Sequence, residues 1–180
     1  LYIIYTALTA LEVIFLLLGG MSLFDSVVHA LSTAGTGGFG AYNASAANFS
    51  PYIQWVLTVF MFLFAINFNL FYLILLGRMR DVFRNTEFKA YLAIVLVSVA
   101  VITAEIMPLY RTFSDSLRQA AFQVASIIST TGFITADFTV WTPLSKALLL
   151  GLMFVGGCAG STAGGLKVSR VAILFKMMRS

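Results

Sequence analysis

Four long apolar stretches constrain this chain more than any other feature of its sequence. They cover residues 1–18, 54–77, 88–107 and 143–178, and a helix needs roughly 20 predominantly apolar residues to cross a membrane. The chain is 60% hydrophobic and only 10% charged, whereas soluble domains carry about a quarter charged residues. A soluble fold could not bury so much apolar surface, so the sequence predicts an all-α integral membrane protein.

The second and fourth stretches contain residues that are unusual in a membrane helix. The fourth is too long for one span and is interrupted by GGCAGSTAGG at 156–165. The second, 54–77, is predicted to be one unbroken span although it contains Asn67 and Asn69. Polar side chains at membrane depth usually face the bundle or a cavity, and either asparagine could line a pore while the other bonds to a neighbouring helix.

Two shorter segments between these stretches have helical periodicity but are too short to cross a bilayer. They are SLFDSVVHALS at 22–32 and FSDSLRQAAFQVASIIS at 113–129. Each is predicted to form a half-helix that is followed at once by a Gly/Thr turn and a phenylalanine. Side chains that accept hydrogen bonds favour helix N-caps, and the candidates here are Ser22 or Asp25, and Ser114 or Asp115.

An internal repeat relates the two halves of the chain. Setting Gly38 on Gly132 aligns STAGTGGF (32–39) with SIISTTGF (126–133). Both halves have the same order of membrane helix, half-helix, turn and membrane helix, and an even number of crossings separates them. The repeats are therefore predicted to be parallel. The expected division is a first unit over 1–77, a linker over 78–89 and a second unit over 90–180 with a broken last helix.

The same alignment places His29 on Gln123 and Asn43 on Asp137. His29 is the only histidine, and histidine titrates near neutral pH. Its position on the half-helix favours a structural hydrogen bond behind the turn over a proton-sensing role.

The basic residues predict the orientation, because cytoplasmic loops are enriched in Lys and Arg. The linker and the C-terminal end are expected to be cytoplasmic, which places both Gly/Thr turns on the outer side. Arg111, Arg118 and Lys146 are exceptions that fall on the outer side. The cytoplasmic set is Arg78, Arg80, Arg84, Lys89, Lys167, Arg170, Lys176 and Arg179.

The Gly/Thr turns have the residue types of a site for a monovalent cation. Irregular backbone survives at membrane depth only when it is buried in protein or lines a water-filled cavity. Consecutive carbonyl oxygens can replace the hydration shell of a cation, and glycine permits the backbone dihedrals that this requires. Neither 32–39 nor 126–133 contains Asp or Glu, which disfavours a divalent-cation site. Turns that bind no ion are the alternative, and the matched copies favour a filter.

Three segments carry a resemblance to a known family. HALSTAGTGGFGAYNAS, ASIISTTGFITADF and GGCAGSTAGGLKVSR resemble the TrkH members of the Trk/Ktr/HKT potassium transporter superfamily. In that family one chain carries four helix–pore-loop–helix units around one pore, and each unit offers a filter turn with a key glycine. The resemblance covers essentially all of the chain and implies the second and third units, which form half of a potassium-channel-like pore.

The resemblance also assigns expected roles to individual residues. Gly38 and Gly132 match the filter glycines, and the key glycine is single in this family. The ion-coordinating carbonyls would be those of Thr36, Gly37, Gly38, Phe39, Thr130, Thr131, Gly132 and Phe133. Units one and four, and the arginine that the family places below the filter, are absent from these 180 residues. Two turns cannot surround an ion, so this piece alone is not expected to conduct.

The interruption at 156–165 allows three interpretations. Gly160 and Gly165 have the spacing of a phosphate-binding loop, but Leu166 stands where that motif needs lysine. Small residues also allow close helix packing, yet this density of glycine disfavours a continuous helix. The favoured interpretation is an unwound loop below the filter that resembles the gating loop of the family. Its residues would be Gly156, Gly157, Gly160, Ser161, Thr162, Gly164 and Gly165.

The remaining expectations concern function and partners. No Ser/His/Asp set, metal-ligand spacing or carboxylate pair supports catalysis, so we expect no enzyme, no organic cofactor and no nucleic-acid partner, with potassium as the transported ion. Sodium-permeable or sodium-coupled transport and a non-conducting scaffold remain as alternatives. The resemblance implies a multi-pass protein of the bacterial inner membrane. It also implies two further pore units in the same chain and a homodimer with a cytosolic nucleotide-binding regulatory subunit.

Overall fold

The computed structural model describes residues 2–42, 45–110 and 112–178, and over these residues its regular elements are helices. One isolated parallel bridge joins Val155 to Leu166. The helices are α1 (Tyr2–Leu18), α2 (Leu23–Ala34), α3 (Pro51–Phe64), α4 (Phe68–Leu75), α5 (Met79–Arg84), α6 (Thr86–Ile106), α7 (Phe113–Ile128), α8 (Pro143–Phe154) and α9 (Val168–Met178), with short 3-10 turns η1 (Met107–Leu109) and η2 (Phe138–Val140).

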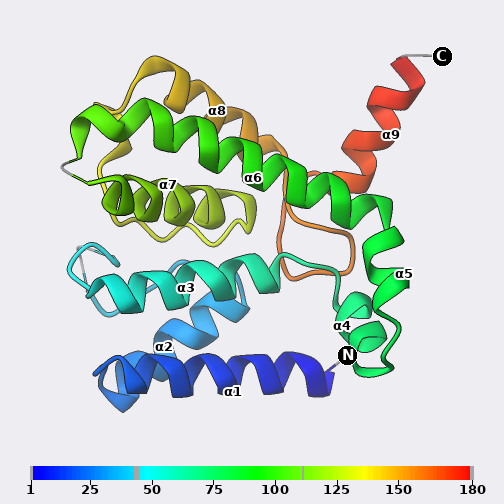
Figure 1. Ribbon diagram of the computed structural model, residues 1–180. Coiled ribbons are helices and arrows are strands. Elements are labelled where there is room, and N and C mark those ends of the chain that lie inside the picture. The colour runs from blue at the N-terminus through cyan, green and yellow to red at the C-terminus, as the bar shows by residue number, and fades with distance from the viewer. Residues whose placement is uncertain (1, 43–44, 111, 179–180) are drawn as a thin grey trace.

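The order of the packed helices follows the repeat predicted from the sequence. In Figure 1, α1, α2 and α3 form one half, and α6, α7 and α8 form the other. The half-helix α7 packs against α6 and α8 of its own unit and against α3 of the first unit. Each half contains a long helix, a half-helix, a turn and a broken helix pair in that order, so the prediction of parallel repeats is confirmed.

The second apolar stretch corrects the prediction of an unbroken span over 54–77. It forms α3 and α4, whose axes are bent by 93° at the break between them. Asn67 is the N-cap of α4, and its side chain accepts a hydrogen bond from the N–H of Asn69. An asparagine that satisfies the first turn of a new helix favours a break there, so both units end in a broken helix pair.

Two other boundaries differ from the sequence-based expectation. Ser22 caps α2 as predicted, but the N-cap of α7 is Thr112, not Ser114 or Asp115. The Thr112 hydroxyl accepts from the N–H of Asp115 and donates to its carboxylate, so these two residues fix the first turn of α7. The expected linker, 78–89, contains α5 and the first turn of α6.

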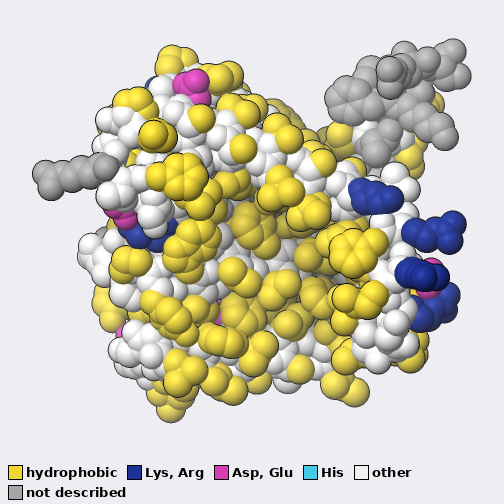
Figure 2. Space-filling view, viewed as in Figure 1, with side chains coloured by type: hydrophobic (Ala, Val, Ile, Leu, Met, Phe, Trp, Pro, Cys, Tyr) yellow, Lys and Arg dark blue, Asp and Glu magenta, His cyan; other side chains and the backbone are white. Residues whose placement is uncertain are grey.

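The surface of the molecule is largely apolar, as a lipid-facing protein requires. Figure 2 shows hydrophobic side chains over most of one face, with Lys and Arg gathered at the end where α5 lies. The arginines of this segment, Arg78, Arg80 and Arg84, are exposed. Over the described residues one helical stretch, Thr86–Leu109, is long and apolar enough to span a membrane alone, and α3 with α4 qualifies as a bent pair.

Candidate ion filter and intramembrane loop

The two Gly/Thr turns have the same backbone conformation at matching positions. Thr36 and Thr130 have φ values of 51° and 58°, and Gly38 and Gly132 have φ values of 68° and 91°. A positive φ is uncommon for a residue with a Cβ and costs energy for threonine. In both turns a strained threonine therefore lies two residues before a left-handed glycine, so the two turns share one backbone conformation.

Two matching serines, Ser32 and Ser126, hydrogen bond to the turns through both their carbonyls and their hydroxyls. The N–H groups of Gly37 and Thr131 donate to the carbonyls of Ser32 and Ser126, at 2.7 and 3.0 Å. The Ser32 hydroxyl accepts from the N–H of Phe39 at 2.7 Å, whereas the Ser126 hydroxyl donates to the carbonyl of Phe133 at 2.6 Å. The Phe133 carbonyl, one of the predicted ion ligands, therefore already has a partner within its unit. These two serines were missed as site residues, although the alignment pairs them.

The turns of the two units lie against each other. A Cβ placed on Gly38 would come within 2.0 Å of the Thr131 carbonyl oxygen, so only glycine fits there. A Cβ on Gly132 would meet nothing within 4 Å. The predicted filter residues of the two units are thus brought together on the same side of the protein, but with unequal surroundings.

The phenylalanines that follow the filter glycines differ in the same way. Phe133 is 1% exposed and stacks on His29 of the first unit, with ring centroids 5.7 Å apart. Phe39 is 79% exposed. Phe133 therefore packs on the half-helix of the unit before it, and Phe39 lacks such a neighbour within the described residues.

The segment from Gly156 to Gly165 is non-helical, as predicted, and it contacts both turns. The Thr36 hydroxyl donates to the Thr162 carbonyl at 3.3 Å, and the N–H of Gly164 donates to the Thr130 hydroxyl at 2.7 Å. Within the two turns, the threonines with positive φ are therefore the residues that hydrogen bond to this segment. All seven predicted loop residues lie within it, and we call it the intramembrane loop.

The intramembrane loop also fills the break between α3 and α4 (Figure 1). The N–H groups of Thr162 and Cys158 donate to the carbonyls of Phe64 and Ala65, at 3.3 and 2.9 Å. The N–H of Phe68 donates to the Gly160 carbonyl at 3.1 Å. Because buried backbone groups must be paired, each broken helix pair satisfies groups that the other leaves open.

Comparison with known proteins identifies the family. The model of the TrkH cation transport protein family matches residues 1–101 and again residues 90–180. The chain belongs to the TrkH family. It is 38% identical over 180 residues to the Trk system potassium uptake protein TrkH of Salmonella typhimurium, and 33% identical over 178 residues to TrkI of Halomonas elongata. These alignments cover 98% of this chain but only 37% and 36% of those proteins.

A solved TrkH structure has the same fold. The crystal structure of the potassium transporter TrkH from Vibrio parahaemolyticus matches with a TM-score of 0.92 and 34% identity, over 99% of this chain and 40% of that one. The all-α membrane class and the repeat of helix, pore loop and helix are thereby confirmed. The relatives are transporters named for potassium uptake, and the chain spans less than two fifths of the length of the curated relatives above.

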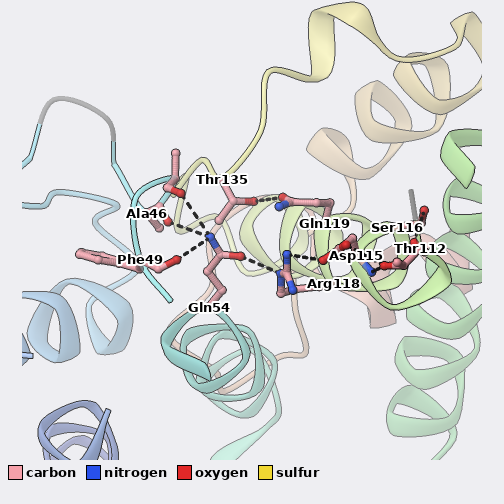
Figure 3. A network of polar contacts seen from close by, with 10 residues as sticks. Ala46, Phe49, Gln54, Thr112, Asp115, Ser116, Arg118, Gln119 and Thr135 are labelled. Carbon is pink, nitrogen blue, oxygen red and sulfur yellow. Dashed lines mark hydrogen bonds and ion pairs between the residues drawn. The ribbon is translucent and has the colours of Figure 1, made fainter. Parts of the chain in front are cut away.

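A polar network holds this part of the TrkH chain together (Figure 3). The buried Gln54 amide donates to the carbonyls of Ala46 and Phe49, both at 3.2 Å, and its oxygen accepts from Arg118 at 3.0 Å. Arg118 also pairs with Asp115 at 2.7 Å. These contacts tie α3 of the first unit to α7 of the second. The sequence offered one signal, a glutamine within an apolar stretch.

This network continues to the C-terminal end of the second filter turn. The N–H of Ala46 donates to the Ile134 carbonyl at 3.0 Å, and the N–H of Ile134 donates to the Ser45 hydroxyl at 3.1 Å. Farther along the chain, the N–H of Thr139 donates to the Asp137 carboxylate and holds the pKa of that group below its usual value. The exposed Asp137 carboxylate therefore stays charged. Its expected counterpart, Asn43, lies outside the described residues.

We expect Gln54→Leu to destabilise the folded protein. The change removes the donor to the loop carbonyls and leaves the guanidinium of Arg118 with Asp115 alone. A buried polar group left without its partner costs about 1–3 kcal/mol, so the melting temperature of the purified protein should fall by several degrees. Val59→Leu, on an exposed position of α3, is the control and should melt like the wild type. An unchanged melting temperature for Gln54→Leu would show that the network is not stabilising.

His29 lies behind the filter turns in a buried position. Its Nδ1 lies 2.8 Å from the carbonyl of Asp25, one turn earlier in α2. Its ring also packs edge-on against Phe49, with centroids 5.1 Å apart. These contacts favour the structural interpretation of His29 over proton sensing. Of the two asparagines, Asn67 faces the intramembrane loop, with its Oδ1 3.0 Å from the position of a Cβ on Gly160, whereas Asn69 is exposed.

Proposed function

We propose that this chain forms half of a pore that carries potassium across the cell membrane. The observation that carries the proposal is the matched pair of turns, in which threonine and glycine adopt left-handed conformations in register. Such backbone can present successive carbonyl oxygens to a dehydrated cation. The ligands would come from the carbonyls of Thr36, Gly37, Gly38 and Phe39 in the first unit and Thr130, Thr131, Gly132 and Phe133 in the second.

The remainder of the filter would come from two further units of the same chain. The exposure of Phe39 supports this, because its counterpart Phe133 is buried on the half-helix of the preceding unit. A unit placed before α1 in the sequence would cover Phe39 in the same way. The coverage of the longer relatives also leaves room for such units.

The intramembrane loop is proposed to be the gate of this pore. It lies against both filter turns, it carries no charged side chain between Gly156 and Gly165, and it cannot trap a cation electrostatically. A pocket of about 430 Å³ lined by Gly160, Thr162 and Phe68 lies beside it and offers space for movement.

Regulation is proposed to come from the cytoplasmic side. Lys167 lies between the loop and α9, and the exposed Arg170 lies in the first turn of α9. A homodimer with a cytosolic nucleotide-binding subunit, in the bacterial inner membrane with several spans, fits the family resemblance. Sodium-permeable or sodium-coupled transport remains the alternative, since neither turn contains a group that excludes sodium by itself.

The test is a flux measurement on the full-length transporter that contains this chain. Purified protein in vesicles of anionic and zwitterionic phospholipid should take up ⁸⁶Rb⁺, a potassium substitute, and unlabelled K⁺ should compete better than Na⁺. Equal competition by Na⁺ would favour the sodium alternative. Uptake no greater than that of protein-free vesicles, with a correctly folded sample, would favour the non-conducting scaffold.

A further inference from the structure

Glu87 is the acidic side chain that contacts the intramembrane loop. It lies in the first turn of α6, just after the N-cap Asn85. Its Oε1 accepts from the N–H of Ala159 at 2.7 Å and from the N–H of Ser169 at 3.3 Å. Ala159 belongs to the intramembrane loop, and Ser169 belongs to the first turn of α9. One carboxylate oxygen therefore joins three segments that are far apart in the sequence.

Glu87 lies at the N-terminal ends of two helices. The first-turn N–H groups of a helix lack partners within the helix and carry a partial positive charge. Glu87 lies at the N-terminus of α6 and also accepts from the N-terminus of α9, so two helix ends stabilise one carboxylate. Hydrogen bonds to an ionised acceptor are roughly twice as strong as those between neutral groups.

Within the described residues, the other hydrogen bonds to the intramembrane loop do not involve a carboxylate. In the part of the chain that the structure describes, they come from backbone groups, the Thr36 and Thr130 hydroxyls, and the ammonium of Lys167, which donates to the Ala163 carbonyl. The Lys167 contact is made by a residue that follows the loop directly. Glu87 is thus the charged side chain that holds the loop from a separate helix.

We propose that Glu87 is a positioning residue that latches the intramembrane loop in its place below the filter turns. Displacement of α9 relative to α6 would break the contact with Ser169 and weaken the hold on Ala159, so a pull on α9 from the cytoplasm would release the loop. This inference rests on the proposed gating function of the loop. It adds the residue through which movement at the cytoplasmic end reaches the loop.

The test compares ⁸⁶Rb⁺ flux of full-length variants in vesicles without any regulatory protein. Glu87→Ala should raise basal flux about threefold to tenfold, because loss of one charge-assisted contact shifts a two-state equilibrium by that order. Glu87→Gln should stay closer to wild type, since an amide oxygen can accept both N–H groups. Asp81→Ala is the matched control. It removes an acidic group from the same end, where Asp81 pairs with Arg78, and should leave flux unchanged.

Cys158 provides a second measurement that does not depend on flux. It is fully buried beside Ala159, and peptide mass spectrometry can follow its modification by a membrane-permeable maleimide. Glu87→Ala should raise the labelling rate about threefold or more, by the same shift in population, and Glu87→Gln should raise it less. A purely structural role for Glu87 would instead lower expression and flux together. If the alanine variant does not fold, Glu87→Asp, which keeps the charge but shortens its reach, should show the same two increases.

Deletion of Ala159–Gly164 separates this inference from the proposed function. If the deletion raises flux but Glu87→Ala changes neither flux nor labelling, the loop is a gate and Glu87 is not its latch. If the deletion leaves flux unaltered, the gating proposal itself is wrong. In a protein that already carries the deletion, Glu87→Ala should have no further effect, and a full additional increase would overturn the latch.

Discussion

Serine in place of Gly132 is expected to lower the preference of the full-length transporter for K⁺ over Na⁺ by about tenfold, which corresponds to roughly 1.4 kcal/mol of differential binding. Gly132 has a φ of 91°, a conformation that residues with a Cβ rarely adopt. The backbone should therefore rotate toward negative φ, and the carbonyls of Thr131 and Gly132 should turn with it. The measurement is competition of K⁺ and Na⁺ with ⁸⁶Rb⁺ uptake in vesicles.

Gly132 is a better test of the filter than Gly38 because of the space around it. A Cβ at Gly132 meets no atom within 4 Å, whereas a Cβ at Gly38 would lie 2.0 Å from a backbone oxygen. We therefore expect Gly132→Ser to fold and Gly38→Ser to lose much of its folded yield. Gly151→Ser, on α8 with equally open surroundings, controls for the added hydroxymethyl group. Wild-type selectivity in well-expressed Gly132→Ser would remove Gly132 from the filter.

The repeat and the positions of the turns could be predicted because their determinants are local. The glycines at 38 and 132 and the threonines at 36 and 130 must adopt left-handed backbone, and such positions are visible in the sequence as matched Gly/Thr segments. The non-helical loop could be predicted for the same reason, because glycine density disfavours a helix wherever the segment lies. The roles of these residues as ion ligands and gate remain predictions.

The break between α3 and α4 was not predicted, because only one of its determinants, the Asn67 cap, is local and the others are distant in the sequence. The segment around Ala65 contains no glycine or proline, and its open carbonyls are satisfied by Cys158 and Thr162 of the other unit. Tertiary partners thus override the helix-forming tendency of an apolar stretch. The contact of Glu87 with Ala159 likewise spans 72 positions of the chain, and no local pattern indicates it. The Thr112 cap was missed for a simpler reason, since three neighbouring residues compete for one role.

Removal of Ala159–Gly164 from the full-length transporter is expected to raise basal ⁸⁶Rb⁺ flux by about tenfold or more and to weaken the response to the regulatory subunit. The deletion takes away the Thr162 and Gly164 contacts to the two filter threonines. It keeps the two ends of the loop joined, because the N–H of Gly156 still donates to the Leu166 carbonyl at 2.9 Å. A tenfold change in the ratio of open to closed pores corresponds to about 1.4 kcal/mol. The deletion removes several hydrogen bonds that each contribute about 1 kcal/mol, which is enough to cause that change.

A milder variant separates gating from damage to the fold. Thr162→Val removes the hydroxyl that donates to the Phe64 carbonyl at 3.2 Å but keeps the loop backbone and its length. Its flux should lie between those of the wild type and the deletion, because the N–H of the same residue still bonds to Phe64. The deletion also removes the partners of the Phe64 carbonyl and the Phe68 N–H, so some loss of thermal stability should accompany the higher flux. A deletion protein that is stable and yet conducts and responds like the wild type would mean that the segment packs the two broken helices together without closing the pore.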